Sequence, residues 1–118
     1  MPGTSPSVSY VPNSGSFVIA FQEWQQRLWT YSTASSSFAN TTLGMEAASS
    51  PSIATKSDGN YVIAIHAVEG NLWTYASGAG TNREFGMRAA TSPSVATGTG
   101  GNYIAAFQAN TGSLLYYS

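Results

Sequence analysis

YVIAIHAVEGNLWTY, residues 61–75, occurs in two further versions, as FVIAFQEWQQRLWTY at 17–31 and YIAAFQANTGSLLYY at 103–117. Each version contains two runs of β-branched and aromatic residues separated by a polar turn, which is typical of paired β-strands. No segment shows the 3.6-residue hydrophobic period of a helix. The stretch therefore predicts three β-hairpins built to one design.

Two shorter motifs set the period of the repeat. The motif S-P-S-[IV] begins at Ser5, Ser50 and Ser92, so the spacing is 45 and then 42 residues, and GMEAASSPS and GMRAATSPS at Gly44 and Gly86 close the first two repeats. Repeats of this length are typical of propellers and related arrays. We expect a single partial domain over residues 1–118, with repeats at about 5–49, 50–91 and 92–118.

Four strands are expected in a complete repeat. In the second repeat they are predicted at 52–55, 61–67, 71–76 and, as a short outer strand, near 84–87, whereas the third repeat lacks the fourth strand. The second strand is apolar on both pleat faces, so each small sheet must be covered on both sides. Stacked sheets of this kind describe the blades of an all-β propeller made of four-stranded antiparallel sheets.

Three blades cannot close a ring, because the first and third would each expose an apolar face meant for a neighbour. We expect identical chains to associate head to tail, the third blade of one meeting the first of the other. A homodimer would give a six-bladed ring, within the usual range of about four to eight blades. A five-bladed ring with shared strands stays open as the alternative.

Composition narrows the possible partners. Only 8% of the 118 residues are charged, with four basic against five acidic residues, which argues against binding to nucleic acid or to an anionic membrane surface. The longest apolar run, at 17–21, is too short for membrane insertion. The start, MPGTSPSV, lacks the basic and apolar regions of a signal peptide, while the abundance of Ser, Thr, Asn and Gly favours a secreted, extracellular origin. The sequence TGTGG at 97–101 lacks the lysine of a phosphate loop, and no cofactor is expected.

The repeat pattern S-P-S-[IV]-A, then Y-x-I-A-[FI]-[QH]-A-x-x-G-x-L-W-T-Y, then G-M-x-A resembles the tandem repeats of bacterial tachylectin-like β-propeller lectins. The resemblance covers nearly the whole chain, about 2.7 repeats. It implies a multivalent lectin with a shallow sugar site in each blade or between blades, built from an aromatic ring and a few amide or charged side chains. Leu115 stands where Trp29 and Trp73 stand in the other repeats, so a third site would be altered.

Sugar binding requires a flat apolar ring for the C–H face of the sugar and planar hydrogen-bonding groups for its hydroxyls. The repeats supply both on the second and third strands and on the turn between them. The candidate residues for carbohydrate binding are Gln22, Trp24, Arg27, Trp29, His66, Glu69, Asn71, Trp73 and Gln108.

Each candidate also has a structural interpretation. Trp29 and Trp73 can fill the space between blades, and the recurring polar position of Gln22, His66 and Gln108 can supply a buried hydrogen bond. The charges of the turns can simply be solvated. Trp24 differs, because EWQQ replaces the AVEG and ANTG of the other repeats, and its ring is expected to be exposed.

Catalysis is not expected. His66 is the only histidine and Asp58 the only aspartate, so a Ser-His-Asp triad would have to use this one pair, and a zinc site lacks ligands because cysteine is absent. Paired carboxylates for glycoside hydrolysis stay open in principle among Glu23, Glu46, Asp58, Glu69 and Glu84. The sequence therefore predicts a non-catalytic, carbohydrate-binding propeller whose partners are glycans and further copies of itself. The alternative is a structural or scaffold module, or an engineered propeller fragment, without a ligand.

Overall fold

The computed structural model describes residues 2–118, which form strands in three antiparallel sheets. The first sheet has the order β1-β2-β3-β4. Its strands are β1 Ser7–Val11, β2 Ser16–Gln22, β3 Arg27–Ser32 and β4 Ser37–Gly44.

The other two sheets follow the same plan. The second has the order β5-β6-β7-β8, and in the third β10 lies between β9 and β11. Their strands are β5 Ser52–Thr55, β6 Tyr61–His66, β7 Asn71–Ala76, β8 Ala79–Gly86, β9 Ser94–Thr97, β10 Tyr103–Gln108 and β11 Leu114–Tyr117.

The outer strand of the second sheet corrects the sequence prediction. A short strand at 84–87 was expected, but β8 has eight residues and starts at Ala79, directly opposite Ala76. The turn that makes this possible is Ser77-Gly78, in which both residues have positive φ angles of 54° and 80°. Two successive positive φ angles are the signature of the tight type I′ hairpin turn.

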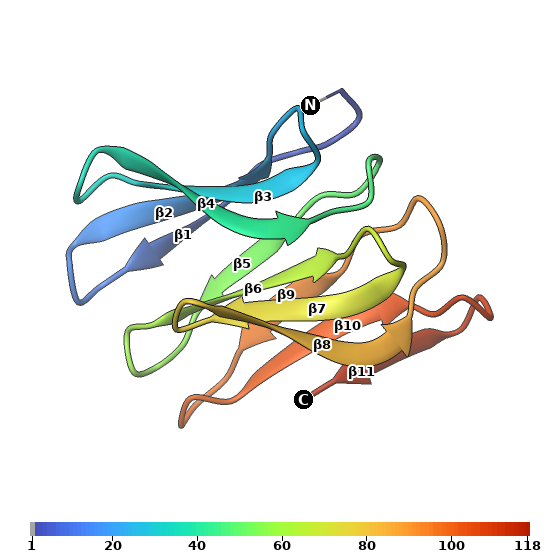
Figure 1. The fold of residues 1–118 in the computed structure, drawn as a ribbon. Helices are drawn as coiled ribbons and strands as arrows, with labels where there is room; N and C mark the ends of the chain where they lie inside the picture. The colour runs from blue at the N-terminus through green and yellow to red at the C-terminus, as the bar shows by residue number, and fades with distance from the viewer. Residues whose placement is uncertain (1) are drawn as a thin grey trace.

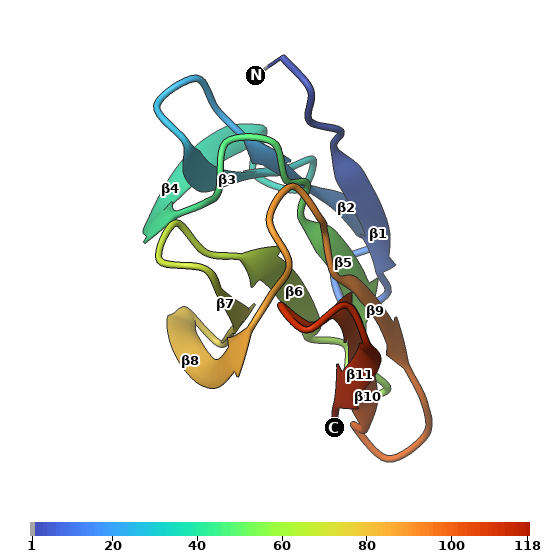
Figure 2. The ribbon, with the colours of Figure 1, turned by 90° about the vertical axis from the view of Figure 1, so that its right-hand side faces the viewer.

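The three sheets stand beside one another as the blades of a propeller (Figure 1). The first strands of the sheets, β1, β5 and β9, lie side by side along one edge, while β4 and β8 lie at the opposite edge (Figure 2). The chain therefore crosses each blade from the inside to the outside and then returns to the inside of the next blade. The all-β class and the blade-like sheets expected from the sequence are confirmed.

The core consists of two layers, one in each interface between neighbouring blades. The side of a blade that faces the following blade repeats the same three residue types, as Val18, Ala20 and Leu28 in the first blade and Val62, Ala64 and Leu72 in the second. All six are buried. Each set packs against the opposite side of the following blade, where Ile53, Ile63 and Ile65 or Val95, Ala105 and Phe107 lie.

We refer to the contact between the first and second blades as the first interface and to that between the second and third blades as the second interface. Burial of apolar area in these two layers supplies most of the driving force for folding. In residues 2–118, no helix is long and apolar enough to cross a membrane.

Candidate functional site

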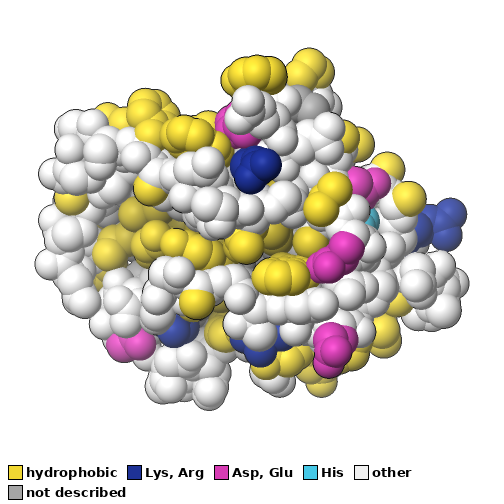
Figure 3. Space-filling model, in the orientation of Figure 1, with side chains coloured by type: hydrophobic (Ala, Val, Ile, Leu, Met, Phe, Trp, Pro, Cys, Tyr) yellow, Lys and Arg dark blue, Asp and Glu magenta, His cyan; other side chains and the backbone are white. Residues whose placement is uncertain are grey.

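A small pocket opens at the outer end of the first interface. It has a volume of about 90 Å³ and is lined by residues from the end of β4, the end of β6, the following turn and β7, namely Leu43, Gly44, Ile65, Ala67, Val68, Glu69 and Trp73. Figure 3 shows hydrophobic side chains gathered along the furrow between the upper and lower halves of this face. The two sides of the pocket come from neighbouring blades.

Backbone contacts between the blades fix the shape of this pocket. The amide of Val68 donates to the carbonyl oxygen of Gly44 at 3.1 Å, and Met45 forms an isolated β-bridge with Ala67. A Cβ atom at Gly44 would lie 3.1 Å from Cγ1 of Val68, so a larger residue there would crowd the turn. The glycine of the GM motif thus allows β4 to approach the turn of the next blade.

Trp73 and Glu69 form the polar edge of the pocket. Glu69 lies on the β6–β7 turn and Trp73 on β7, and the indole Nε1–H of Trp73 donates a hydrogen bond to Oε1 of Glu69. The Trp73 ring is half-buried and packs against the core of the first interface. The hydrogen bond holds the ring in one orientation and leaves acceptor capacity on the carboxylate.

The arrangement can bind a small polar molecule that has one apolar edge. The rings and methyl groups that line the pocket accept an apolar group, and the Glu69 carboxylate accepts hydrogen bonds from hydroxyl groups. A volume of about 90 Å³ is well below the roughly 300 to 1,000 Å³ typical of pockets that enclose a ligand, so a monosaccharide would insert one edge and leave the rest exposed. A carboxylate beside an indole ring is a suitable receptor for such an edge.

The equivalent place in the second interface is filled. Phe85 replaces Leu43, and its ring centroid lies 5.6 Å from that of Phe107 and 6.3 Å from that of Tyr117. Leu115 stands where Trp73 stands, so the indole is missing as well. The indole and carboxylate that flank the pocket of the first interface therefore have no counterparts at the equivalent positions of the second, which hold Leu115 and Thr111.

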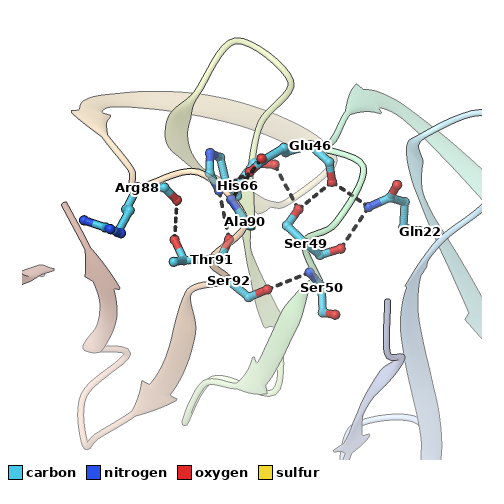
Figure 4. A network of polar contacts seen from close by, with 9 residues as sticks. All are labelled: Gln22, Glu46, Ser49, Ser50, His66, Arg88, Ala90, Thr91 and Ser92. Carbon is cyan, nitrogen blue, oxygen red and sulfur yellow. Dashed lines mark hydrogen bonds and ion pairs between the residues drawn. The ribbon is translucent and has the colours of Figure 1, made fainter. Parts of the chain in front are cut away.

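Gln22 lies in the first interface, away from the pocket, and is 2% exposed. Its Nε2 donates to the carbonyl oxygens of Glu46 and Ser49, both at 2.9 Å, and so holds the loop that leads from the first blade to the second (Figure 4). Its Oε1 is buried without a hydrogen-bond partner in the described residues. This position follows the structural interpretation given to the recurring polar residue.

His66 occupies the same position one blade later. Its Nδ1 lies 2.8 Å from the carbonyl oxygen of Thr91 and 2.8 Å from Oε2 of Glu46 (Figure 4). The Glu46 carboxylate also accepts from the amide of Ala90, which has a positive φ of 63°. Glu46 therefore ties the two inter-blade loops to each other through one carboxylate.

The remaining candidates are spread over the molecule. Trp24 is 76% exposed on the β2–β3 turn, and Arg27 is exposed at the start of β3. Asn71 donates to Oδ1 of Asn82 on the neighbouring strand, and Gln108 donates to the carbonyl oxygen of Gly112 in its own turn. Among the nine predicted residues, the structure brings Glu69 and Trp73 together in a pocket.

Five lining residues were not among the sequence candidates. Leu43 and Gly44 belong to the preceding blade, and the other three, Ile65, Ala67 and Val68, lie at the end of β6 and on the turn that follows it. The GM motif carried a signal for Gly44, because a glycine recurring at the end of an outer strand indicates a close approach of two backbones.

The two ends of the blade array expose unpaired faces. The outward side of the first blade, here named the entry face, carries Val8, Tyr10, Phe17, Ile19, Phe21, Trp29, Tyr31 and Phe38. The outward side of the third blade, here named the exit face, carries Ala96, Ile104, Ala106, Gln108, Leu114 and Tyr116. Leu114 is 79% exposed and Phe38 62% exposed, which is unusual for large apolar side chains outside an interface.

No three His, Asp or Glu side chains gather within residues 2–118 where they could hold a metal ion.

No protein-family model and no curated protein matches this sequence. Among solved structures, a fucose lectin from Kordia zhangzhouensis in complex with methyl-fucoside has the same fold, with a TM-score of 0.62 and 9% sequence identity. The match covers 96% of this chain, and so reaches all three of its sheets, and 90% of that chain.

Proposed function

We propose that this chain is a carbohydrate-binding, lectin-like propeller protein that binds sugars without catalysis and assembles from identical copies. The observation that carries the proposal is the pocket of the first interface, where Trp73 and Glu69 flank an apolar lining. A fucose lectin with the same fold supports the sugar as ligand class. The repeats that resemble tachylectin-like lectins point in the same direction.

The pocket favours a sugar with a methyl group at its edge. Leu43, Ile65 and Val68 offer aliphatic surface, and burying a methyl group against such surface contributes about 0.8 kcal/mol. A 6-deoxyhexose presents a methyl group beside vicinal hydroxyl groups, and the Glu69 carboxylate can accept hydrogen bonds from these hydroxyl groups. The methyl-fucoside of the structurally similar lectin belongs to this class.

Assembly is proposed from the repetition of the exit-face residues. Ile104, Ala106 and Leu114 occupy the positions of Val18, Ala20 and Leu28, which are buried against the second blade. The entry face of the first blade likewise carries the equivalents of the residues with which the second and third blades pack against the blade before them. A second copy placed head to tail would therefore repeat a packing that the chain already uses twice.

Hydrogen bonds between the blades supply the register of that contact. Ile53 N donates to Ser7 Oγ at 3.1 Å in the first interface, and Val95 N donates to Ser52 Oγ at 3.0 Å in the second. At the contact between copies, the equivalent hydrogen bond would run from Val8 N to Ser94 Oγ of the other copy.

A hollow on one face and a bulky aromatic pair on the other also support the proposed contact. An open hollow of about 610 Å³ lies along the exit face, bordered by Ala96, Thr97, Gly98 and Ile104. The entry face carries Tyr10 and Phe17, stacked edge to face at 5.3 Å, where the second blade has the smaller Thr55. The aromatic pair of one copy can therefore enter the hollow of another.

Two experiments test the two halves of this proposal. A glycan array with the folded protein should show binding to fucose or other 6-deoxyhexoses, and the variant Leu43→Phe, which gives the first interface the residue type of the second, should lose it. The variant Phe85→Leu is the matched control, because it leaves the first interface unchanged. If the wild-type protein binds no glycan on the array, the scaffold alternative is favoured instead.

Light scattering tests the assembly. A twofold, head-to-tail pair of 12.3 kDa chains is expected at micromolar concentration, and Ile104→Asp should convert it to a monomer by placing a charge on the exit face. Class averages in electron microscopy would then distinguish six blades from five. A wild-type protein that stays monomeric would rule out self-association.

A further inference from the structure

The first blade contains half of a second pocket. The residues that the second blade contributes to the first pocket have equivalents 44 positions earlier in the chain. Ile65, Ala67, Val68, Glu69 and Trp73 correspond to Phe21, Glu23, Trp24, Gln25 and Trp29. The half pocket is therefore richer in aromatic and polar groups than the complete one.

Two buried polar atoms in this half pocket have no partner in the described residues. They are Oε1 of Glu23, which can only accept while the carboxylate is ionised, and Nε1 of Trp29, which can only donate. In the second blade the equivalent indole is satisfied by Glu69, but the first blade has Gln25 at that position and it forms no such bond. Buried groups without partners are unfavourable, and a ligand that supplies both bonds would relieve this.

The register brings these two side chains close together. Phe21 pairs with Trp29, and the amide of Glu23 donates to the carbonyl oxygen of Arg27, so the pairing of β2 with β3 continues to Glu23. Glu23 and Trp29 are thus diagonal neighbours on one face of the sheet, a spacing that long side chains can bridge. A single hydroxyl group can donate to a carboxylate and accept from an indole at the same time.

The half pocket lacks the wall that Leu43 and Gly44 of the preceding blade provide in the first interface. On the assumption that the proposed lectin function and assembly hold, we propose that the exit face of a second copy covers the half pocket and completes a second sugar site. The third sheet has no strand outside β11 in residues 2–118, so it holds no counterpart of Leu43 and Gly44 and the cover comes from β10 and β11. A trisaccharide is therefore the probe that also reaches the side of the second site that these strands leave uncovered.

The three tryptophans of the chain allow each site to be followed separately. Each indole N–H gives its own nitrogen–proton NMR signal, which Trp→Phe substitution at each position assigns. The probes are methyl-fucoside and a fucosylated trisaccharide. In the assembled wild-type protein, we expect both probes to shift the Trp73 signal and the trisaccharide to shift that of Trp29.

The monomeric variant Ile104→Asp is the decisive comparison, with Leu114→Asp as a second variant on the same face if the first does not fold. In the monomer the Trp73 signal should still shift and the Trp29 signal should not. A Trp29 signal that stays unchanged in the assembled protein, or that shifts equally in the monomer, would overturn the inference and leave the proposed function standing. A Trp73 signal that responds to no sugar would instead overturn the proposed function, and the second site with it.

Glu23→Gln supplies a readout specific to the second site. It keeps the size of the side chain but removes the charged acceptor, so trisaccharide affinity at Trp29 should fall by about tenfold while the response of Trp73 stays the same. If Glu23→Gln leaves the trisaccharide affinity at Trp29 unchanged, Glu23 has no role in the second site.

Discussion

Gln22 and His66 hold two successive inter-blade loops by the same kind of bond. Nε2 of Gln22 lies 2.9 Å from the carbonyl oxygen of Ser49, and Nδ1 of His66 lies 2.8 Å from that of Thr91. Both side chains are 2% exposed, so each places one donor in a site closed to water. A recurring polar residue at the end of a buried strand thus serves the joint between blades.

The first prediction follows from this equivalence. His66→Gln should keep the bond to Thr91 and change the free energy of unfolding by less than about 1 kcal/mol. His66→Leu should remove this bond and leave the Thr91 carbonyl and the Glu46 carboxylate without the imidazole. It should lower the free energy of unfolding by about 1 to 3 kcal/mol. Urea denaturation of both variants measures the difference, and equal losses would show that the bond contributes nothing specific.

The second prediction compares two tryptophans. Trp24 is 76% exposed on a turn, and Trp24→Ala should change the midpoint of thermal unfolding little. Trp73 packs against the core of the first interface, and Trp73→Ala should destabilise the protein by about 3 kcal/mol, as expected for truncation of a packed aromatic. Calorimetry of the two variants is the measurement, and similar losses would contradict the assignment of Trp73 to the core.

The repeat pattern predicted the blades because β2, β6 and β10 consist mainly of β-branched, aromatic and other apolar residues, and because β6 in the central blade is buried on both faces. The outer strand β8 was placed five residues too late, since AGTNREFG alternates poorly and has one side in solvent. The site was harder to predict. Trp29 and Trp73 lie in nearly the same strand sequence. Their surroundings differ because Gln25 replaces Glu69 in the turn and because the neighbouring blade, which is remote in sequence, covers only Trp73.

The third prediction concerns pH. Burial, together with the neighbouring Tyr75, raises the pKa of Tyr61 above its ordinary value of 10.0. A raised pKa means that the folded state favours the neutral phenol, so this contribution to stability is complete below pH 10 and is lost as the pH rises through the folded pKa. Tyr61→Phe, which places in the second blade the residue that Phe17 provides in the first, should reduce the loss of stability between pH 9 and 11, measured by urea denaturation.

The fourth prediction is the creation of a site in the second interface. Phe85→Leu should remove the ring that lies 5.6 Å from Phe107, and Leu115→Trp with Thr111→Glu should supply the missing pair. The triple variant should gain one binding site per chain for the sugar that the wild type binds, as counted by calorimetric titration. Phe85→Leu alone is the control, since it opens space without adding the indole and the carboxylate. An unchanged number of sites in the triple variant would show that the first pocket depends on features other than these residues.

The fifth prediction concerns the apparent affinity of the assembled protein for a dense glycan surface. A pocket of about 90 Å³ that admits one edge of a sugar should bind a free monosaccharide weakly, because little surface is buried. An assembly of two chains presents two such pockets at fixed separation, and linked sites gain roughly 100 to 10,000-fold in apparent affinity when the ligands are dense enough to be reached together. Surface plasmon resonance on a densely glycosylated chip, compared with titration of the free sugar, should show a gain in this range. The monomeric Ile104→Asp variant keeps the pocket of the first interface but should lose most of the gain on the dense surface. Equal affinity of the assembled protein for the free sugar and for the dense surface would show that its pockets do not act together.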